Sequence, residues 1–165
     1  MHETFMQRAL EIARQSLDDP GALPYGSVVV KDGKIIGEGL NKALAKSDPT
    51  SHCEVEAIRE ACAKLGTTNL AGCDLYTTAE PCVMCASVMY LTGISRVYYA
   101  CAATDTAPFM TRMAALDPKW RRPMPFIEIQ SQVALPTDQR RMPASRLMVS
   151  EAKALLDEYA EKVGA

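Results

Sequence analysis

The residues with the clearest capacity for chemistry are a histidine, a glutamate and two cysteines. His52 and Glu54 are separated by one residue, and Cys82 and Cys85 lie in a Pro-Cys-Val-Met-Cys segment. Imidazole nitrogen and thiolate sulfur are donors that Zn²⁺ prefers, and a structural zinc site fills all four tetrahedral positions with protein groups. Here only His52, Cys82 and Cys85 are candidate ligands, so one position remains for water. The pattern predicts one zinc ion per chain in a hydrolytic site, with Glu54 beside the ion and not bound to it.

Both halves of this pattern stand where helices are expected to begin. Cys82 and Cys85 have the spacing of residues on one helix face, and Pro81 suits a helix start because it lacks an N–H. His52 follows a run of cap-forming residues, 48–51, and precedes apolar residues at helical spacing. The positive end of a helix dipole also favours thiolate over thiol. The sequence therefore predicts two helix starts that face one metal ion.

A structural zinc site, or cysteines without a metal role, is the competing interpretation. The sequence places no further Cys or His near Cys82 except Cys85 itself, and the other histidine is His2, close to the chain start. Cys53 is the remaining candidate ligand, but neighbouring residues rarely converge on one ion. The other cysteines fall at apolar positions and are interpreted as small buried residues: Cys62, Cys73 and Cys101.

Composition indicates an ordinary globular protein. The chain has 165 residues, of which 48% are hydrophobic and 23% charged, so we expect a single domain over residues 1–165. No apolar run reaches the ~20 residues of a membrane span, and the first residues lack a signal-peptide pattern. Six cysteines without such a signal favour a reducing compartment, which predicts a cytoplasmic protein without a membrane partner. The net charge of −2 makes a nucleic-acid partner less expected.

Apolar periodicity predicts strands and helices in alternation, typical of a layered α/β fold. The metal-ligand segments would lie in the loops at the carboxyl edge of the sheet. From about residue 104 the pattern is less regular, with an edge strand at 126–129 and a terminal helix at 146–162. The other expected elements are helices at 4–17, 52–65 and 82–91, hairpin strands at 28–30 and 35–37, and strands at 75–78 and 96–100.

These motifs resemble the cytidine-deaminase-like superfamily of zinc deaminases, which carries the pattern H-x-E…P-C-x-x-C. The resemblance runs from about residue 5 to 105 and is closest to bacterial guanine deaminases; tRNA adenosine deaminases are similar but less close. It implies a three-layer α/β/α fold with a central mixed sheet of about five strands, and a homodimer. The segments that carry it are 24–26, 32–41, 48–54 and 76–85.

The resemblance also implies a reaction and roles for individual residues. The enzyme would hydrolyse an amino-substituted heterocycle, guanine or a related purine or pterin-like base, to its oxo product and ammonia. Glu54 would move the protons, and Asn41 would bind the heterocycle, although a turn role for Asn41 is also reasonable. Tyr25 and Phe109 would stack on the ring, with core packing as the alternative. Asp105 would supply a substrate-binding carboxylate, with Asp117 as a second candidate.

Three departures from that family pattern leave the substrate open. Cys53 stands where these deaminases usually have Ala. Residues 104–110 lack the Phe-Asp pair of guanine deaminases, and the chain does not end on an aromatic residue. The alternatives are a tRNA-specific adenosine deaminase and a non-catalytic, zinc-stabilised interaction module.

Overall fold

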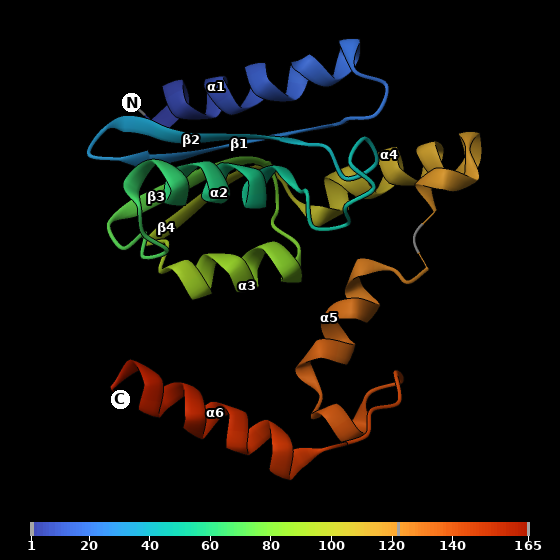
Figure 1. Ribbon diagram of the computed structural model, residues 1–165. Helices are drawn as coiled ribbons and strands as arrows, with labels where there is room; N and C mark the ends of the chain where they lie inside the picture. Colours follow the sequence, from blue (N-terminus) through green and yellow to red (C-terminus); the bar gives the residue numbers. More distant parts are fainter. Residues whose placement is uncertain (1, 122, 165) are drawn as a thin grey trace. The chain divides into compact units, whose positions relative to one another are not determined.

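A computed structural model describes residues 2–121 and 123–164 (Figure 1). The chain divides into two compact units, residues 1–123 and 124–165. The expectation of one domain over the whole chain stays a prediction, and the two units are described separately. Within the described residues, no helix combines the length and the apolar character needed to cross a membrane.

The first unit is built on a four-stranded mixed sheet with strand order β2-β1-β3-β4. Strands β1 (Leu23–Lys31) and β2 (Lys34–Asn41) form the predicted antiparallel hairpin. The turn residues Asp32 and Gly33 have φ angles of 50° and 72°, the left-handed pair that an Asp-Gly hairpin turn requires. Strand β3 (Cys73–Ala79) is antiparallel to β1 and parallel to β4 (Arg96–Cys101).

Helices cover both faces of this sheet, which confirms the predicted three-layer fold class. Helix α1 (His2–Arg14), continued by the short turn η1 (Gln15–Asp18), lies on one face. Helices α2 (Cys53–Leu65) and α3 (Val83–Thr92) lie on the other (Figure 1). Each interface has its own apolar core. The larger core, between the sheet and α2 and α3, includes Val29, Ile58, Leu75 and Met89, and the smaller, under α1, includes Ile12, Val28 and Tyr76.

The remainder of the chain is helical, which corrects one predicted strand. Helix α4 (Ala103–Leu116) and the turn η2 (Pro118–Trp120) complete the first unit. The second unit contains α5 (Phe126–Ala134), the turn η3 (Thr137–Gln139) and α6 (Val149–Val163). The expected edge strand at 126–129 is the start of α5. Four residues are too few for a period of two to be told from a helical face, and Phe126, Ile129 and Val133 have helical spacing.

The sheet therefore has four strands in the described residues, one fewer than expected.

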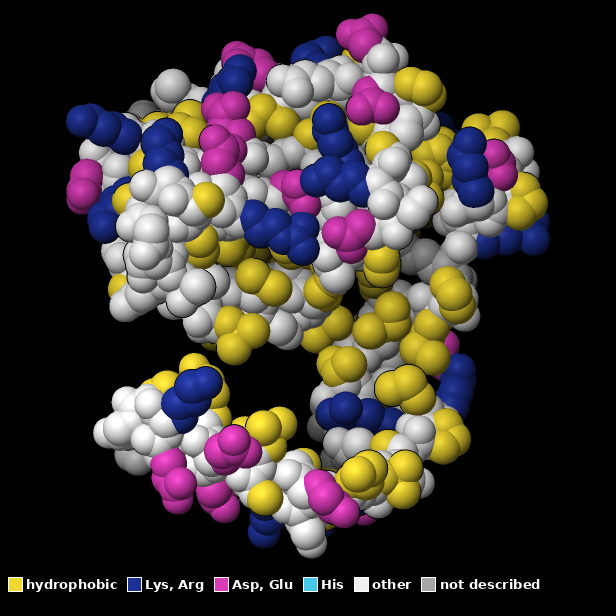
Figure 2. Space-filling view, in the orientation of Figure 1, with side chains coloured by type: hydrophobic (Ala, Val, Ile, Leu, Met, Phe, Trp, Pro, Cys, Tyr) yellow, Lys and Arg dark blue, Asp and Glu magenta, His cyan; other side chains and the backbone are white. Residues whose placement is uncertain are grey.

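The second unit differs from the first in having no buried residue among its described positions. Large apolar side chains are exposed along α6, where Leu156 is 69% and Tyr159 66% exposed (Figure 2).

Close packing of α2 on β2 fixes where α2 begins. A Cβ atom at Gly39 would lie 2.0 Å from the carbonyl oxygen of Cys53, and one at Gly37 would lie 2.2 Å from the carbonyl oxygen of Ala57. Real Cβ contacts are never this short, so only glycine allows the helix to approach the strand so closely. The first turn of α2, which carries Glu54, is therefore held directly against the sheet.

Candidate metal centre and active site

Three donor atoms from two helix starts lie close together in the first unit. His52 is the N-cap of α2, Cys82 is the N-cap of α3, and Cys85 lies in the first turn of α3. The Nδ1 atom of His52 is 3.7 Å from the sulfur of Cys82 and 3.5 Å from that of Cys85, and the two sulfurs are 3.6 Å apart. A tetrahedral zinc ion with ordinary Zn–S and Zn–N bonds separates its ligand atoms by about 3.5–3.8 Å. The three atoms thus fit one face of a zinc tetrahedron.

The local backbone explains why these residues meet. Strands β2 and β3 are both antiparallel to β1, so the segments that follow them leave the sheet at the same edge. Both helices then begin from an extended N-cap residue, with φ and ψ of −77° and 153° at His52 and −69° and 167° at Cys82. The loop before His52 is ordered by Asp48, whose carboxylate accepts hydrogen bonds from the N–H and the hydroxyl of Thr50.

The two cysteine sulfurs interact strongly with each other. Their hydrogen bond, aided by His52, lowers the pKa of Cys82 to about 4. The same hydrogen bond, together with burial, raises the pKa of Cys85 above its ordinary value. The pKa values of the two thiols thus shift in opposite directions. Zinc binds thiolates, so the ion would compensate two sulfur charges that otherwise repel each other.

Glu54 is buried beside this group. Glu54 lies in the first turn of α2 and is 5% exposed. This burial raises the pKa of its carboxyl above the ordinary value. The thiol of Cys53 donates a hydrogen bond of 3.1 Å to Glu54 Oε2. Burial and the neighbouring carboxylate raise the pKa of the Cys53 thiol well above its usual range. Among the described residues, the group of potential metal ligands comprises His52, Cys82 and Cys85, without Glu54 or Cys53.

The predicted substrate-binding residues occupy three different settings. Asn41 is buried at the end of β2, and its side-chain oxygen accepts the N–H of Ala43 at 3.3 Å, the turn role considered above. Tyr25 lies where the register of β1 on β2 shifts, between Leu23 and Gly26, and irregularities of this kind often re-aim side chains near active sites. Its ring meets that of Phe109 edge to face, with centroids 6.3 Å apart. Binding of substrate by these residues stays a prediction.

Both candidate loop carboxylates have structural partners. Asp105 is exposed, and its Oδ2 accepts the N–H of Ala102 at 2.8 Å, which caps the start of α4. Asp117 accepts the N–H of Lys119 at 2.9 Å and caps η2. These contacts give each carboxylate an ordinary helix-capping role, and a substrate role for Asp105 remains a prediction.

A set of buried polar residues on β1 and β3 was not found from the sequence. Its members are Ser27, Thr77 and Thr78, and Thr78 accepts the N–H of Gly26 at 3.1 Å. The hydroxyl of Thr77 lies 3.8 Å from the sulfur of Cys53. The available signal was a polar residue inside otherwise apolar strands: Ser27 directly precedes three valines, and Thr77 follows Leu75 and Tyr76.

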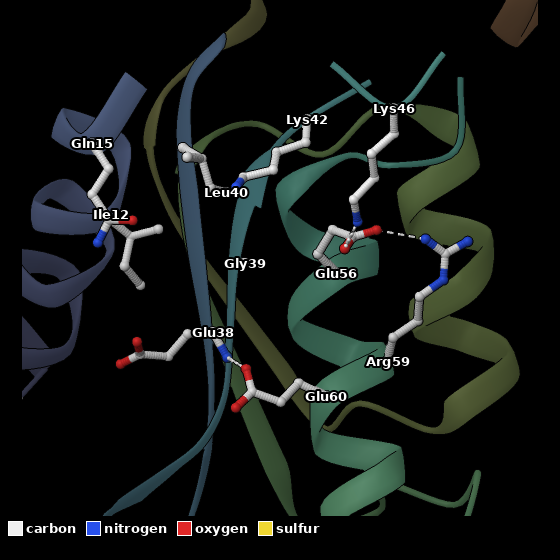
Figure 3. A pocket seen from close by; sticks show the side chains of 10 residues that line it. All are labelled: Ile12, Gln15, Glu38, Gly39, Leu40, Lys42, Lys46, Glu56, Arg59 and Glu60. Carbon is white, nitrogen blue, oxygen red and sulfur yellow. Dashed lines mark hydrogen bonds and ion pairs between the residues drawn. The ribbon is translucent and has the colours of Figure 1, made fainter. Parts of the chain in front are cut away.

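A separate hollow lies along the free edge of β2, between α1 and α2 (Figure 3). Its volume is about 550 Å³, and none of its lining residues belongs to the metal group. Its cations are already paired, since Lys46 and Arg59 both contact Glu56, at 2.5 and 2.6 Å. The hollow has no group suited to hydrolysis, so the metal group is the candidate active site.

Comparison with known proteins agrees with this geometry. Residues 1–101 match the family described as cytidine and deoxycytidylate deaminase zinc-binding region. The chain belongs to this family. It is 37% identical over 150 residues to guanine deaminase of Bacillus subtilis (strain 168), covering 91% of this chain and 88% of that protein. It is 34% identical over 161 residues to the tRNA-specific adenosine deaminase of Aquifex aeolicus (strain VF5), covering 98% and 95%.

Solved structures of this deaminase family have the same fold. The crystal structure of the Bacillus subtilis guanine deaminase superposes with a TM-score of 0.81 at 34% identity and covers 98% of this chain and 94% of that chain. The guanine deaminase from Nitrosomonas europaea gives a TM-score of 0.60 at 30% identity, with coverage of 64% and 62%. The relatives are hydrolases that act on the C–N bonds of cyclic amidines. The family and the His/Cys/Cys group together fit one Zn²⁺ per chain.

Replacing a zinc ligand should remove the metal and weaken the fold around it. We expect Cys85→Ala to lower the zinc content from one per chain to near zero, because two donors cannot hold the ion tightly. We expect a chelator to lower the melting temperature of the wild type. The melting temperature of Cys85→Ala should be lower from the start and should not respond to a chelator. Elemental analysis and thermal unfolding measure both effects. Cys62→Ala, which removes a thiol from the same core without touching the metal group, is the control. A wild-type zinc content in Cys85→Ala would contradict the assignment.

Proposed function

We propose that this deaminase converts guanine, or a related purine or pterin-like base, to the oxo product and releases ammonia. The observation that carries the proposal is a buried carboxyl, that of Glu54, beside a three-ligand zinc group and outside its ligand set. The choice of base follows from the relatives named guanine deaminase in Bacillus subtilis and Nitrosomonas europaea. Small heterocyclic bases are therefore the proposed ligands.

His52, Cys82 and Cys85 would hold the zinc ion. When bound, zinc acts as a Lewis acid that makes water nucleophilic near neutral pH. Glu54 would accept a proton from the attacking water at one carboxylate oxygen and deliver it to the ring nitrogen beside the amino-bearing carbon. Glu54 would then take the second proton of that water, from the hydroxyl now bonded to the carbon, and deliver it to the amino group, which leaves as ammonia as the C–O bond becomes the carbonyl. Burial raises the pKa of this carboxyl, which brings it closer to the range in which a group both accepts and donates protons efficiently.

The remaining site residues would orient the base. Asn41 can donate and accept hydrogen bonds through its side-chain amide, which suits a ring edge that carries both kinds of group. Tyr25 and Phe109 already form an aromatic pair and would pack against the ring. Asp105 would have to leave its cap at Ala102 to bind substrate, so it is the weakest member of the proposed set.

A tRNA-specific adenosine deaminase is the second candidate function. It is supported by the relative in Aquifex aeolicus, which aligns over 98% of the chain. Binding of a tRNA needs a basic surface that neutralises phosphates, whereas this chain has a net charge of −2. Charge therefore favours the free base as substrate.

We also propose that the protein is a homodimer. Helix α3 exposes two neighbouring apolar side chains, Tyr90 at 88% and Leu91 at 83%, and the second unit has no buried residue among its described positions. Apolar surface of this kind is typical of subunit interfaces. Light scattering should give twice the chain mass of 18.0 kDa, and a monomeric mass at micromolar concentration would refute the proposal.

Glu54→Gln should abolish turnover without loss of the metal. The amide has nearly the shape of the carboxylate but cannot carry the proton, so kcat should fall by about 10²–10⁴-fold. Ammonia release and elemental analysis measure turnover and zinc content on the same preparation. Glu60→Gln, a change of the same kind on the outer side of α2, is the control. Turnover near that of the wild type would show that another residue moves the proton.

A substrate screen should separate the two candidate functions. We expect the wild-type protein to release ammonia from guanine or a related free base, and not from tRNA. The screen covers guanine, adenine, cytosine, their nucleosides, pterins and aminotriazines, with tRNA beside them. Release from tRNA alone would favour the adenosine deaminase, and release from none of them, with zinc bound, would favour the non-catalytic module.

A further inference from the structure

The carboxylate of Glu54 rests on a small buried group of polar side chains. Cys53 is 2% exposed, and its sulfur donates to Glu54 Oε2 at 3.1 Å. On its other side the same sulfur lies 3.8 Å from the hydroxyl of Thr77, on β3. Ser27, on β1, is the register partner of Thr77 and is buried beside it. The polar contacts therefore run from β3, through Cys53, to the carboxylate.

Buried polar atoms in such a place need a reason. Ser27 and Thr77 are fully buried, and the Ser27 hydroxyl makes no hydrogen bond among the described residues. A buried hydroxyl without a partner destabilises the folded state. An apolar residue at position 53 would leave both hydroxyls and one carboxylate oxygen facing a nonpolar side chain. The thiol instead supplies a donor to the carboxylate and a weak acceptor toward the strands.

Geometry fixes which part of Glu54 the thiol restrains. Cys53 engages Oε2, so the contact restricts rotation of the carboxylate about its last side-chain bond and leaves Oε1 as the second oxygen. The Cys53 backbone is itself immobile, because its carbonyl packs against Gly39 of β2. The donor is thus held by the sheet and not by a flexible loop. A restraint of this type matters for proton transfer, since small errors in position lower rates strongly.

We propose that Cys53 is a positioning residue for the deamination, and that its thiol, supported by Thr77, holds the Glu54 carboxylate in the orientation from which it transfers protons. This inference rests on the proposed function for its kinetic consequence. The hydrogen bond itself can be tested without any substrate. The two parts of the test therefore fail independently.

Infrared spectroscopy reads the hydrogen bond directly. The S–H stretching band of Cys53, isolated as the difference between the wild type and Cys53→Ala, should lie at the low frequency of a donating thiol. In Glu54→Gln the acceptor is neutral and the band should move to higher frequency, and in Glu54→Ala it should move further. A band at the same frequency in the wild type, Glu54→Gln and Glu54→Ala would show that the thiol does not donate to Glu54, and the proposal would be wrong.

Kinetics test whether the bond orients the carboxylate. Cys53→Ala should lower kcat about tenfold, as expected for a hydrogen bond to a charged group, and leave KM within about twofold and zinc content unchanged. Cys53→Ser, which keeps a donor, should recover most of the lost kcat. Cys62→Ala removes a thiol further along the same helix and should leave kcat as in the wild type.

The outcomes separate the two proposals. Equal kcat in Cys53→Ala and the wild type would overturn the positioning role, and so would a loss of kcat in Cys53→Ser as large as that in Cys53→Ala. Loss of zinc in Cys53→Ala would also overturn it, since the effect would then act through the metal site. A zinc-loaded wild type that deaminates no base would defeat the proposed function instead, and the infrared band would still decide whether Cys53 holds Glu54.

Discussion

The structure of the site depends on holding three donor atoms from two helices within 3.7 Å of one another. A metal ion binds more tightly where the backbone has already brought the ligands close, because each ligand must otherwise give up conformational freedom on binding. Here the sheet brings the ligands together. Strands β2 and β3 run in the same direction, so both helices begin at one edge, and glycines on β2 let α2 approach until its first turn touches the strand.

The same arrangement explains the electrostatics of the site. Two cysteine sulfurs and a buried carboxyl belong to this site, whose interior disfavours charge. The hydrogen bond with Cys82, together with burial, raises the pKa of Cys85, and burial raises the pKa of Glu54. A divalent cation would compensate both thiolates. If Glu54 were also a ligand, it would be fixed as a carboxylate; outside the ligand set and two residues from His52, it would remain available for the proton transfer proposed for it.

Some features of this site were predictable from the sequence because they depend on few residues. A histidine and two cysteines at helix starts define a zinc site almost by spacing alone, and an Asp-Gly pair between two apolar runs defines a hairpin. The prediction of a strand at 126–129 was wrong because the segment is too short to decide. Four residues fit either a strand or a helix, and only Val133, on the same helix face as Ile129, favours the helix. The helix cap formed by Asp105 and the burial of Ser27 could not be predicted from the sequence, since both depend on which groups the fold places nearby.

The reaction is therefore better determined than the substrate. The residues proposed for proton transfer and hydrolysis, His52, Glu54, Cys82 and Cys85, all lie within the matched segment 1–101. The groups proposed to recognise the base include Phe109, which lies outside that segment, on α4. Its partner Tyr25 lies at an irregularity of β1, where the backbone and not the residue type decides where the ring points. Under the proposed function, two relatives can thus share the chemistry and differ in substrate, because the metal group is held by the sheet, whereas the residues proposed to contact the base lie on one helix and at one strand irregularity.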